Sequence, residues 1–63
     1  MLNDHLPDKL FFRPSDVAHM LDVSVKTIYG WIDQGKLDAV KIGGRAVRIP
    51  RQAVFKIIKE INV

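Results

Sequence analysis

The sequence has 63 residues, 48% of them apolar, and a formal net charge of +3. This length predicts one small domain with a marginal core, because such a chain buries only about 60% of its unfolded surface. The absence of cysteine excludes disulfide bonds and thiolate metal clusters. No apolar run is long enough to span a membrane, and no signal peptide is visible. We therefore expect a folded cytoplasmic domain without membrane association.

The start of the chain divides into a polar part and an apolar part. Residues 1–9 show no apolar periodicity and contain Pro7, which predicts a mobile tail ahead of a domain over residues 10–63. Leu10-Phe11-Phe12 is a short apolar run. It indicates either a brief edge strand or an anchor that ties the tail to the core.

A first short helix is predicted over residues 14–21. Pro14 suits the first turn of a helix, where a missing N–H costs nothing, and Asp16 places a negative charge near the positive end of the helix dipole. Asp22 follows in a tight turn that needs a left-handed residue, a conformation that Asp tolerates better than most residues. His19 is expected on the surface. The residues expected to face inward are Val17, Ala18 and Leu21.

The second helix, over residues 24–34, has capping signals at both ends. Ser24 can accept a hydrogen bond from an unpaired N–H of the first turn, and Gly35 can adopt the left-handed conformation that closes a helix. The apolar stripe comprises Ile28, Trp31 and Ile32, so Trp31 is expected in the core. The opposite, polar face carries Lys26, Thr27, Tyr29, Gly30, Asp33 and Gln34. Two helices joined by a tight turn, the second with a polar outer face, are typical of a DNA-binding helix-turn-helix.

Residues 39–49 predict a β-hairpin. Two alternating β-prone runs flank Gly43-Gly44, a pair that suits a tight turn with left-handed residues. The apolar residues expected to share one face of the hairpin are Val40, Ile42, Val47 and Ile49. Lys41 and Arg48 would then share the other face, with Arg45 at the tip.

The last element is a predicted helix over residues 51–61. Pro50 ends the second strand and can start this helix. Its apolar stripe comprises Val54, Ile57, Ile58 and Ile61. Phe55 lies off the stripe and is expected to cover the rim of the core, whereas residues 36–38 are expected to be only a connector.

The positive charge is concentrated in one part of the chain. Residues 24–51 carry a net charge of +4, whereas residues 1–23 carry −2. A localised basic block is the electrostatic footprint of a polyanion partner. Charge alone would favour a solvated surface, so the indication of a polyanion partner depends on the predicted helix-turn-helix beside it.

The ordered set of local motifs resembles the small winged-helix domain of excisionases, which is also the N-terminal DNA-binding domain of MerR-type regulators. The matching segments are Asp16-Val17-Ala18, Leu21-Asp22-Val23-Ser24, Thr27-Ile28-Tyr29-Gly30-Trp31-Ile32, Gly35-Lys36-Leu37, Lys41-Ile42-Gly43-Gly44-Arg45 and Arg48-Ile49-Pro50. The resemblance implies an α+β fold: a small winged helix-turn-helix of two helices, a β-hairpin wing and a C-terminal helix. It also implies that the second helix (24–34) enters the major groove while the wing (39–49) contacts the backbone or the minor groove.

Two positions depart from the family pattern. The turn residue is usually glycine, and here it is Asp22. The position between Tyr29 and Trp31 is often arginine, and here it is Gly30. Glycine inside a helix costs about 1 kcal/mol relative to alanine. Gly30 therefore indicates either close approach of the helix backbone to DNA or weak readout of the bases.

The candidate DNA-binding residues follow from these two elements. Lys26 and Thr27 project from the first turn of the second helix, which usually meets base edges. Backbone contacts are expected from the cations of the wing. The complete set of candidates is Ser24, Lys26, Thr27, Tyr29, Gly30, Gln34, Lys41, Arg45 and Arg48, with Lys36 and Arg51 as second candidates.

The sequence indicates a binding protein rather than an enzyme. It contains no nucleophile–base set, no paired carboxylates and no metal cluster, so no cofactor, metal or small-molecule ligand is expected. We expect double-stranded DNA as the partner, with a site-specific recombinase or further copies of the chain as candidate protein partners. Two uses remain open: an excisionase-type recombination directionality factor of a mobile element, or a small transcription regulator. The alternative is a protein-interaction module that uses the winged-helix scaffold without DNA.

Overall fold

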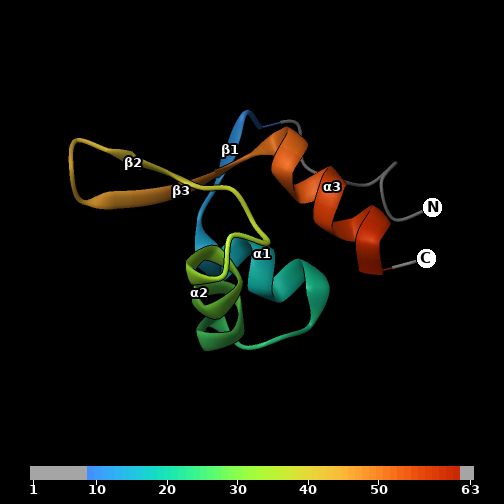
Figure 1. Cartoon of the computed structure of the whole chain (residues 1–63). Coiled ribbons are helices and arrows are strands. Elements are labelled where there is room, and N and C mark those ends of the chain that lie inside the picture. The colour runs from blue at the N-terminus through green and yellow to red at the C-terminus, as the bar shows by residue number, and fades with distance from the viewer. Residues whose placement is uncertain (1–8, 62–63) are drawn as a thin grey trace.

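The computed structural model describes residues 9–61 and contains three helices and three short strands within this range. In chain order they are β1 (Phe11–Phe12), α1 (Pro14–Leu21), α2 (Val25–Asp33), β2 (Val40–Ile42), β3 (Ala46–Pro50) and α3 (Arg51–Ile61). α1 and α2 pack against each other, α3 continues directly from β3, and the β2–β3 hairpin projects away from α3 as an arm (Figure 1). This arrangement confirms the predicted α+β winged helix-turn-helix. The predicted tail over residues 1–9 lies outside the described residues except for Lys9.

The sheet is antiparallel, with strand order β1-β3-β2. Its first strand resolves the question that the sequence left open, because Phe11 and Phe12 pair with Pro50 and Ile49. The two phenylalanines point to opposite faces, as neighbours in a strand do. Phe12 is 1% exposed and Phe11 is 42% exposed. The strand is therefore both an edge strand and an anchor for the start of the chain.

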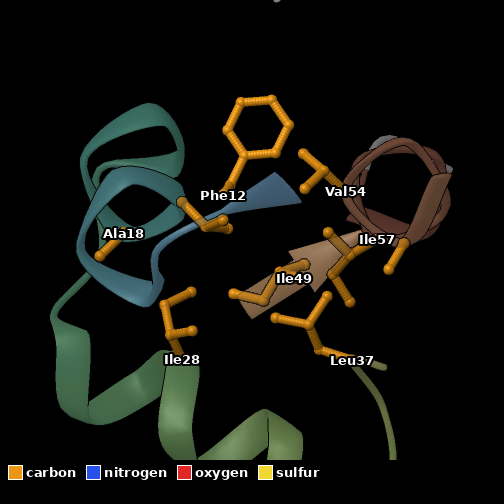
Figure 2. Packing of buried hydrophobic residues seen from close by; sticks show 9 residues of the cluster. Phe12, Ala18, Ile28, Leu37, Ile49, Val54 and Ile57 are labelled. Atoms are coloured by element: carbon orange, nitrogen blue, oxygen red, sulfur yellow. The ribbon is translucent and has the colours of Figure 1, made fainter. Parts of the chain in front are cut away.

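One apolar cluster joins all three helices to β1 and β3. Its buried members are Phe12, Val17, Ala18, Ile28, Leu37, Ile49, Ala53, Val54 and Ile57. Figure 2 shows Ile49 lying between the helices, with Phe12 and Val54 on one side and Ile28 and Leu37 on the other. The core therefore sits on a single face of the sheet.

Three predictions about the core need correction or qualification. Leu37 was expected in a plain connector, yet it is 2% exposed and belongs to the core. Ile61 was expected on the inward stripe of α3 but is 52% exposed, because it lies beyond the last turn that the cluster covers. Trp31 is partly buried and packs against the cluster from outside. Phe55 is partly buried, as predicted for a rim residue.

The turn between α1 and α2 and the end of α2 both have the predicted conformations. Asp22 adopts the left-handed region with φ 57° and ψ 46°, and the N–H of Val23 donates to the carbonyl of Ala18 at 3.0 Å. Gly35 closes α2 with φ 78°. The N–H of Lys36 donates to the carbonyl of Trp31 at 2.9 Å. These local hydrogen bonds end each helix at the residue that the capping signals indicated.

The start of α1 is held by Asp16. Its carboxylate accepts a hydrogen bond from the N–H of Arg13 at 3.1 Å and lies 3.4 Å from the ammonium of Lys9. The hydrogen bond from Arg13 lowers the pKa of Asp16 below its ordinary value of 3.8, and Lys9 acts in the same direction. The charged form of Asp16 is therefore favoured in the folded state.

Asp16 is expected to make stability depend on pH in the acid range. Because its folded pKa lies below its unfolded pKa, its stabilising effect is complete above the unfolded value and is lost as pH falls through the folded value. Asp16→Asn keeps an acceptor for Arg13 but cannot titrate. Denaturant unfolding from about pH 5 to pH 2 should therefore show a shallower loss of stability in the variant than in the wild type. Parallel pH profiles would contradict this role.

The hairpin turn has the predicted shape but a different register. Gly43 and Gly44 have φ of 65° and 77°, and the N–H of Arg45 donates to the carbonyl of Ile42 at 3.4 Å. However, Ile42 lies opposite Ala46, so Arg45 belongs to the loop. The loop therefore has three residues, one more than the predicted two-residue turn. A shift of one residue turns every side chain of a strand to the other face.

The predicted grouping of side chains on the hairpin is therefore wrong. Val40 lies opposite Arg48, and Lys41 lies opposite Val47. Directly opposed residues share a face of a sheet. Lys41 thus shares the face of Val47 and Ile49, whereas Arg48 shares the outer face with Val40.

Candidate nucleic-acid interface

The outer face of α2 carries the polar residues that the sequence placed there. Lys26 and Gln34 are exposed, and Tyr29 is 46% exposed. Ile28, on the other side of the helix, is completely buried. This one buried anchor fixes the rotation of the helix, so its polar side chains face away from the core.

The first turn of α2 is braced by two hydroxyl groups. The Oγ of Ser24 accepts a hydrogen bond from the N–H of Thr27 at 3.0 Å, and the two hydroxyl oxygens lie 2.9 Å apart. This confirms Ser24 as the N-cap. Lys26 lies exposed between the two braced residues. The helix end therefore presents a cation and two ordered hydroxyls together, beside the positive end of the helix dipole.

The wing does not gather its cations on one face. The helix-side face of the sheet is the one on which Ile49 is buried, and Lys41 belongs to that face through its pairing with Val47. Arg45 is exposed in the turn at the tip. Arg48 lies on the opposite face, where its Nη1 donates to the carbonyl of Val47 at 2.8 Å. Lys41 and Arg45 are therefore better placed than Arg48 to share a surface with α2.

The two second candidates differ in their surroundings. Lys36 is exposed directly after the end of α2, close in sequence to the polar face. Arg51 instead begins α3, where its N–H donates to the carbonyl of Leu10 at 2.9 Å and its guanidinium lies 5.3 Å from the centre of the Phe55 ring. Arg51 is thus held against β1 and α3, apart from the helix-turn-helix surface.

Gly30 lies at the centre of the polar face of α2. A Cβ atom at this position would meet no other atom within 4 Å. Packing within the domain therefore gives no reason for glycine here. Glycine lowers the stability of a helix relative to alanine, and no close contact inside the domain compensates for this loss at Gly30.

Three features are absent from the part of the chain that the structure describes. Within residues 9–61, no group of three or more His, Cys, Asp or Glu side chains could hold a metal ion. No helix in this range is long and apolar enough to cross a bilayer. The core over the same residues contains no buried polar or charged side chain.

Two helices joined by a tight turn, followed by a β-hairpin and a further helix, define a small winged helix-turn-helix protein. Residues 11–61 match the family described as a helix-turn-helix domain. An excisionase of Mycobacterium phage D29 is 39% identical over 45 residues, which cover 71% of this chain and 80% of the phage protein. No solved structure matches the chain. The chain belongs to the excisionase-like family of small helix-turn-helix DNA-binding proteins.

Proposed function

We propose that this protein is an excisionase-type recombination directionality factor that binds double-stranded DNA at specific sequences. The similarity to the phage excisionase, which extends over 80% of that protein, carries the proposal. The exposed polar face of α2 supports it, because a recognition helix needs such a face clear of its own core. In this function the protein changes the shape or occupancy of DNA so that a recombinase excises rather than integrates.

In the proposed complex, α2 lies in the major groove with its first turn toward the bases. Lys26 and Thr27 read base edges, and Ser24 and Tyr29 lie where they can contact phosphates. Gln34 faces the groove at the far end of the helix. Arg45 at the wing tip and Lys41 on the helix-side face contact the backbone, or Arg45 enters the minor groove. These assignments follow from exposure and register on the two elements.

Footprinting on DNA around the gene for this protein tests the proposal. We expect a protected segment that overlaps the crossover region of a recombination site. Adding the protein to the matching recombinase should then raise excision and lower integration. Protection of a promoter alone would indicate a transcription regulator, and no protection with any fragment would favour the protein-interaction alternative.

The hairpin register predicts unequal roles for two wing cations. Because Lys41 and Arg48 lie on opposite faces, one duplex held by α2 cannot meet both faces equally. We expect Lys41→Ala to lower the affinity for cognate and for scrambled DNA alike. It should also reduce the slope of log affinity against log salt by about one unit, which corresponds to one lost phosphate contact. Arg48→Ala, the matched control, should have the smaller effect. Equal losses from the two variants in binding titrations would show that both faces reach DNA.

Gly30→Ala is expected to stabilise the free protein and to distinguish the two explanations for glycine at this position. Alanine removes the helix penalty of glycine, about 0.5–1 kcal/mol, and its Cβ meets open space in the free protein. The melting temperature should therefore rise by several degrees. If Gly30 lets the helix backbone approach the bases closely, the same variant should bind cognate DNA more weakly. A stabilised variant with unchanged affinity would instead indicate weak base readout at this position.

A further inference from the structure

The polar face of α2 carries one acidic side chain, Asp33, which is the last residue of the helix. This side chain is exposed. Among residues 9–61, its carboxylate makes neither a hydrogen bond nor an ion pair. The C-terminal end of a helix is the negative end of its dipole, so a carboxylate at this end is unfavourable. The described part of the free protein therefore provides no group that stabilises the charge of Asp33.

The helical period places Asp33 near the centre of the polar face. Successive residues are about 100° apart around the helix axis, so Lys26 and Asp33, seven residues apart, differ by only about 20°. Both lie nearly opposite Ile28, the buried residue that fixes the rotation of the helix. The rise of the helix separates their Cα atoms by about 10.5 Å along the axis. Lys26 and Asp33 therefore lie on one line along the outer side of α2, at its two ends.

Gly30 lies between these two residues and leaves the middle of the line without a side chain. A Cβ atom at this position would meet open space, away from the rest of the domain. A larger residue would therefore hold the middle of the helix away from a DNA duplex. With glycine, the backbone can approach the base edges while the side chains at both ends reach the same groove. The distance of about 10.5 Å corresponds to at most about three base-pair steps of about 3.4 Å.

A carboxylate in the major groove needs a hydrogen-bond donor on a base. Ionised Asp only accepts hydrogen bonds, and the phosphates of DNA repel it. Guanine presents N7 and O6 and thymine presents O4, all of which are acceptors. Adenine presents a donor beside the acceptor N7, whereas cytosine presents the N4 amino group alone. Cytosine is therefore the base that best fits a carboxylate.

We propose that Asp33 determines sequence specificity by accepting a hydrogen bond from the N4 amino group of a cytosine. This cytosine lies within about three base pairs of the base that Lys26 contacts. The inference rests on the proposed DNA-binding function and names one base of the site. The carboxylate also repels the phosphates of DNA that offers it no donor. Asp33 thus lowers the affinity for other sequences, while its hydrogen bond to cytosine preserves the affinity for the cognate site.

Selection of binding sites from random double-stranded DNA, followed by single-base changes in the selected site, tests this role. For the wild type, we expect one position that requires cytosine, where each other base lowers the affinity by roughly 5- to 150-fold. Asp33→Ala should abolish the discrimination at this position and leave the other positions as they are. The physical reason is that alanine neither accepts from cytosine nor repels the other bases.

Asp33→Asn provides a second readout, because an amide both donates and accepts hydrogen bonds. We expect the preference at the same position to change from cytosine to adenine, whose N6 and N7 suit a side-chain amide. Both variants should bind scrambled DNA more tightly than the wild type, since a negative charge near the phosphates is lost. Denaturant titration should show that both variants are folded and at least as stable as the wild type, because the charge opposes the helix dipole.

Glu60→Gln is the matched control. Glu60 is exposed on α3, so this variant removes one negative charge outside the proposed interface. It should select the same site as the wild type. An Asp33→Asn chain that also selects the wild-type site would overturn the inference and leave the proposed function intact. Equal loss of discrimination at every position would overturn it as well, because Asp33 would then act through the placement of the whole helix.

The wild-type selection separates a failure of this inference from a failure of the proposed function. A wild type that enriches no sequence would contradict sequence-specific DNA binding, and the role of Asp33 would be overturned with it. A wild type that enriches a defined site without a required cytosine would overturn the role of Asp33 alone.

Discussion

Replacing Phe12 by alanine is expected to unfold the domain. Phe12 is 1% exposed and lies in the core beside Val54 (Figure 2). Removal of a buried phenylalanine side chain costs about 3–5 kcal/mol. A single hydrophobic core in a chain shorter than about 70 residues rarely supplies more than about 3–5 kcal/mol of stability. The loss therefore removes most or all of the free energy of unfolding.

The neighbouring residue provides a matched control. Phe11→Ala makes the same chemical change one position earlier in β1, on the face where the ring is 42% exposed. Circular dichroism with denaturant titration should show a folded Phe11→Ala chain with a small loss of stability, and a Phe12→Ala chain without a cooperative transition. Equal stability of the two variants would mean that Phe12 does not anchor the core.

DNA binding is expected to weaken steeply with salt. If Lys26, Lys41, Arg45 and neighbouring groups contact about 4–5 phosphates, the slope of log affinity against log salt should be about −4. Raising salt from about 50 to 200 mM would then weaken binding by roughly 250-fold. The physical cause is the release of counterions from DNA as each cation binds.

Lysines outside the proposed interface give the control for this measurement. Lys56 is exposed on α3, which belongs to neither DNA-facing element, and Lys56→Ala should leave the slope unchanged. Lys26→Ala and Arg45→Ala should each reduce its magnitude by about one. A nearly flat titration for the wild type would contradict an electrostatic interface on α2 and the wing.

Local sequence determined where the helices begin and end. Ser24 caps α2 because its Oγ accepts a hydrogen bond from the N–H of Thr27, three residues on, and Gly35 closes the helix through its own backbone conformation. The left-handed turn at Asp22 is likewise decided by neighbouring residues. These signals depend on groups only a few positions apart, so they can be recognised without the fold. The buried anchors Val17 and Ile28 followed from the helical period for the same reason.

The tertiary structure decided which side chains share a surface. The sequence of the hairpin indicated its Gly43-Gly44 turn, but the ladder between β2 and β3 set a register that separates Lys41 from Arg48. Leu37 became a core residue because the chain after α2 passes beside Ile49, which no local pattern reveals (Figure 2). Both outcomes depend on contacts between distant segments. A one-residue change in such a contact reverses which face a side chain occupies, while the local pattern remains the same.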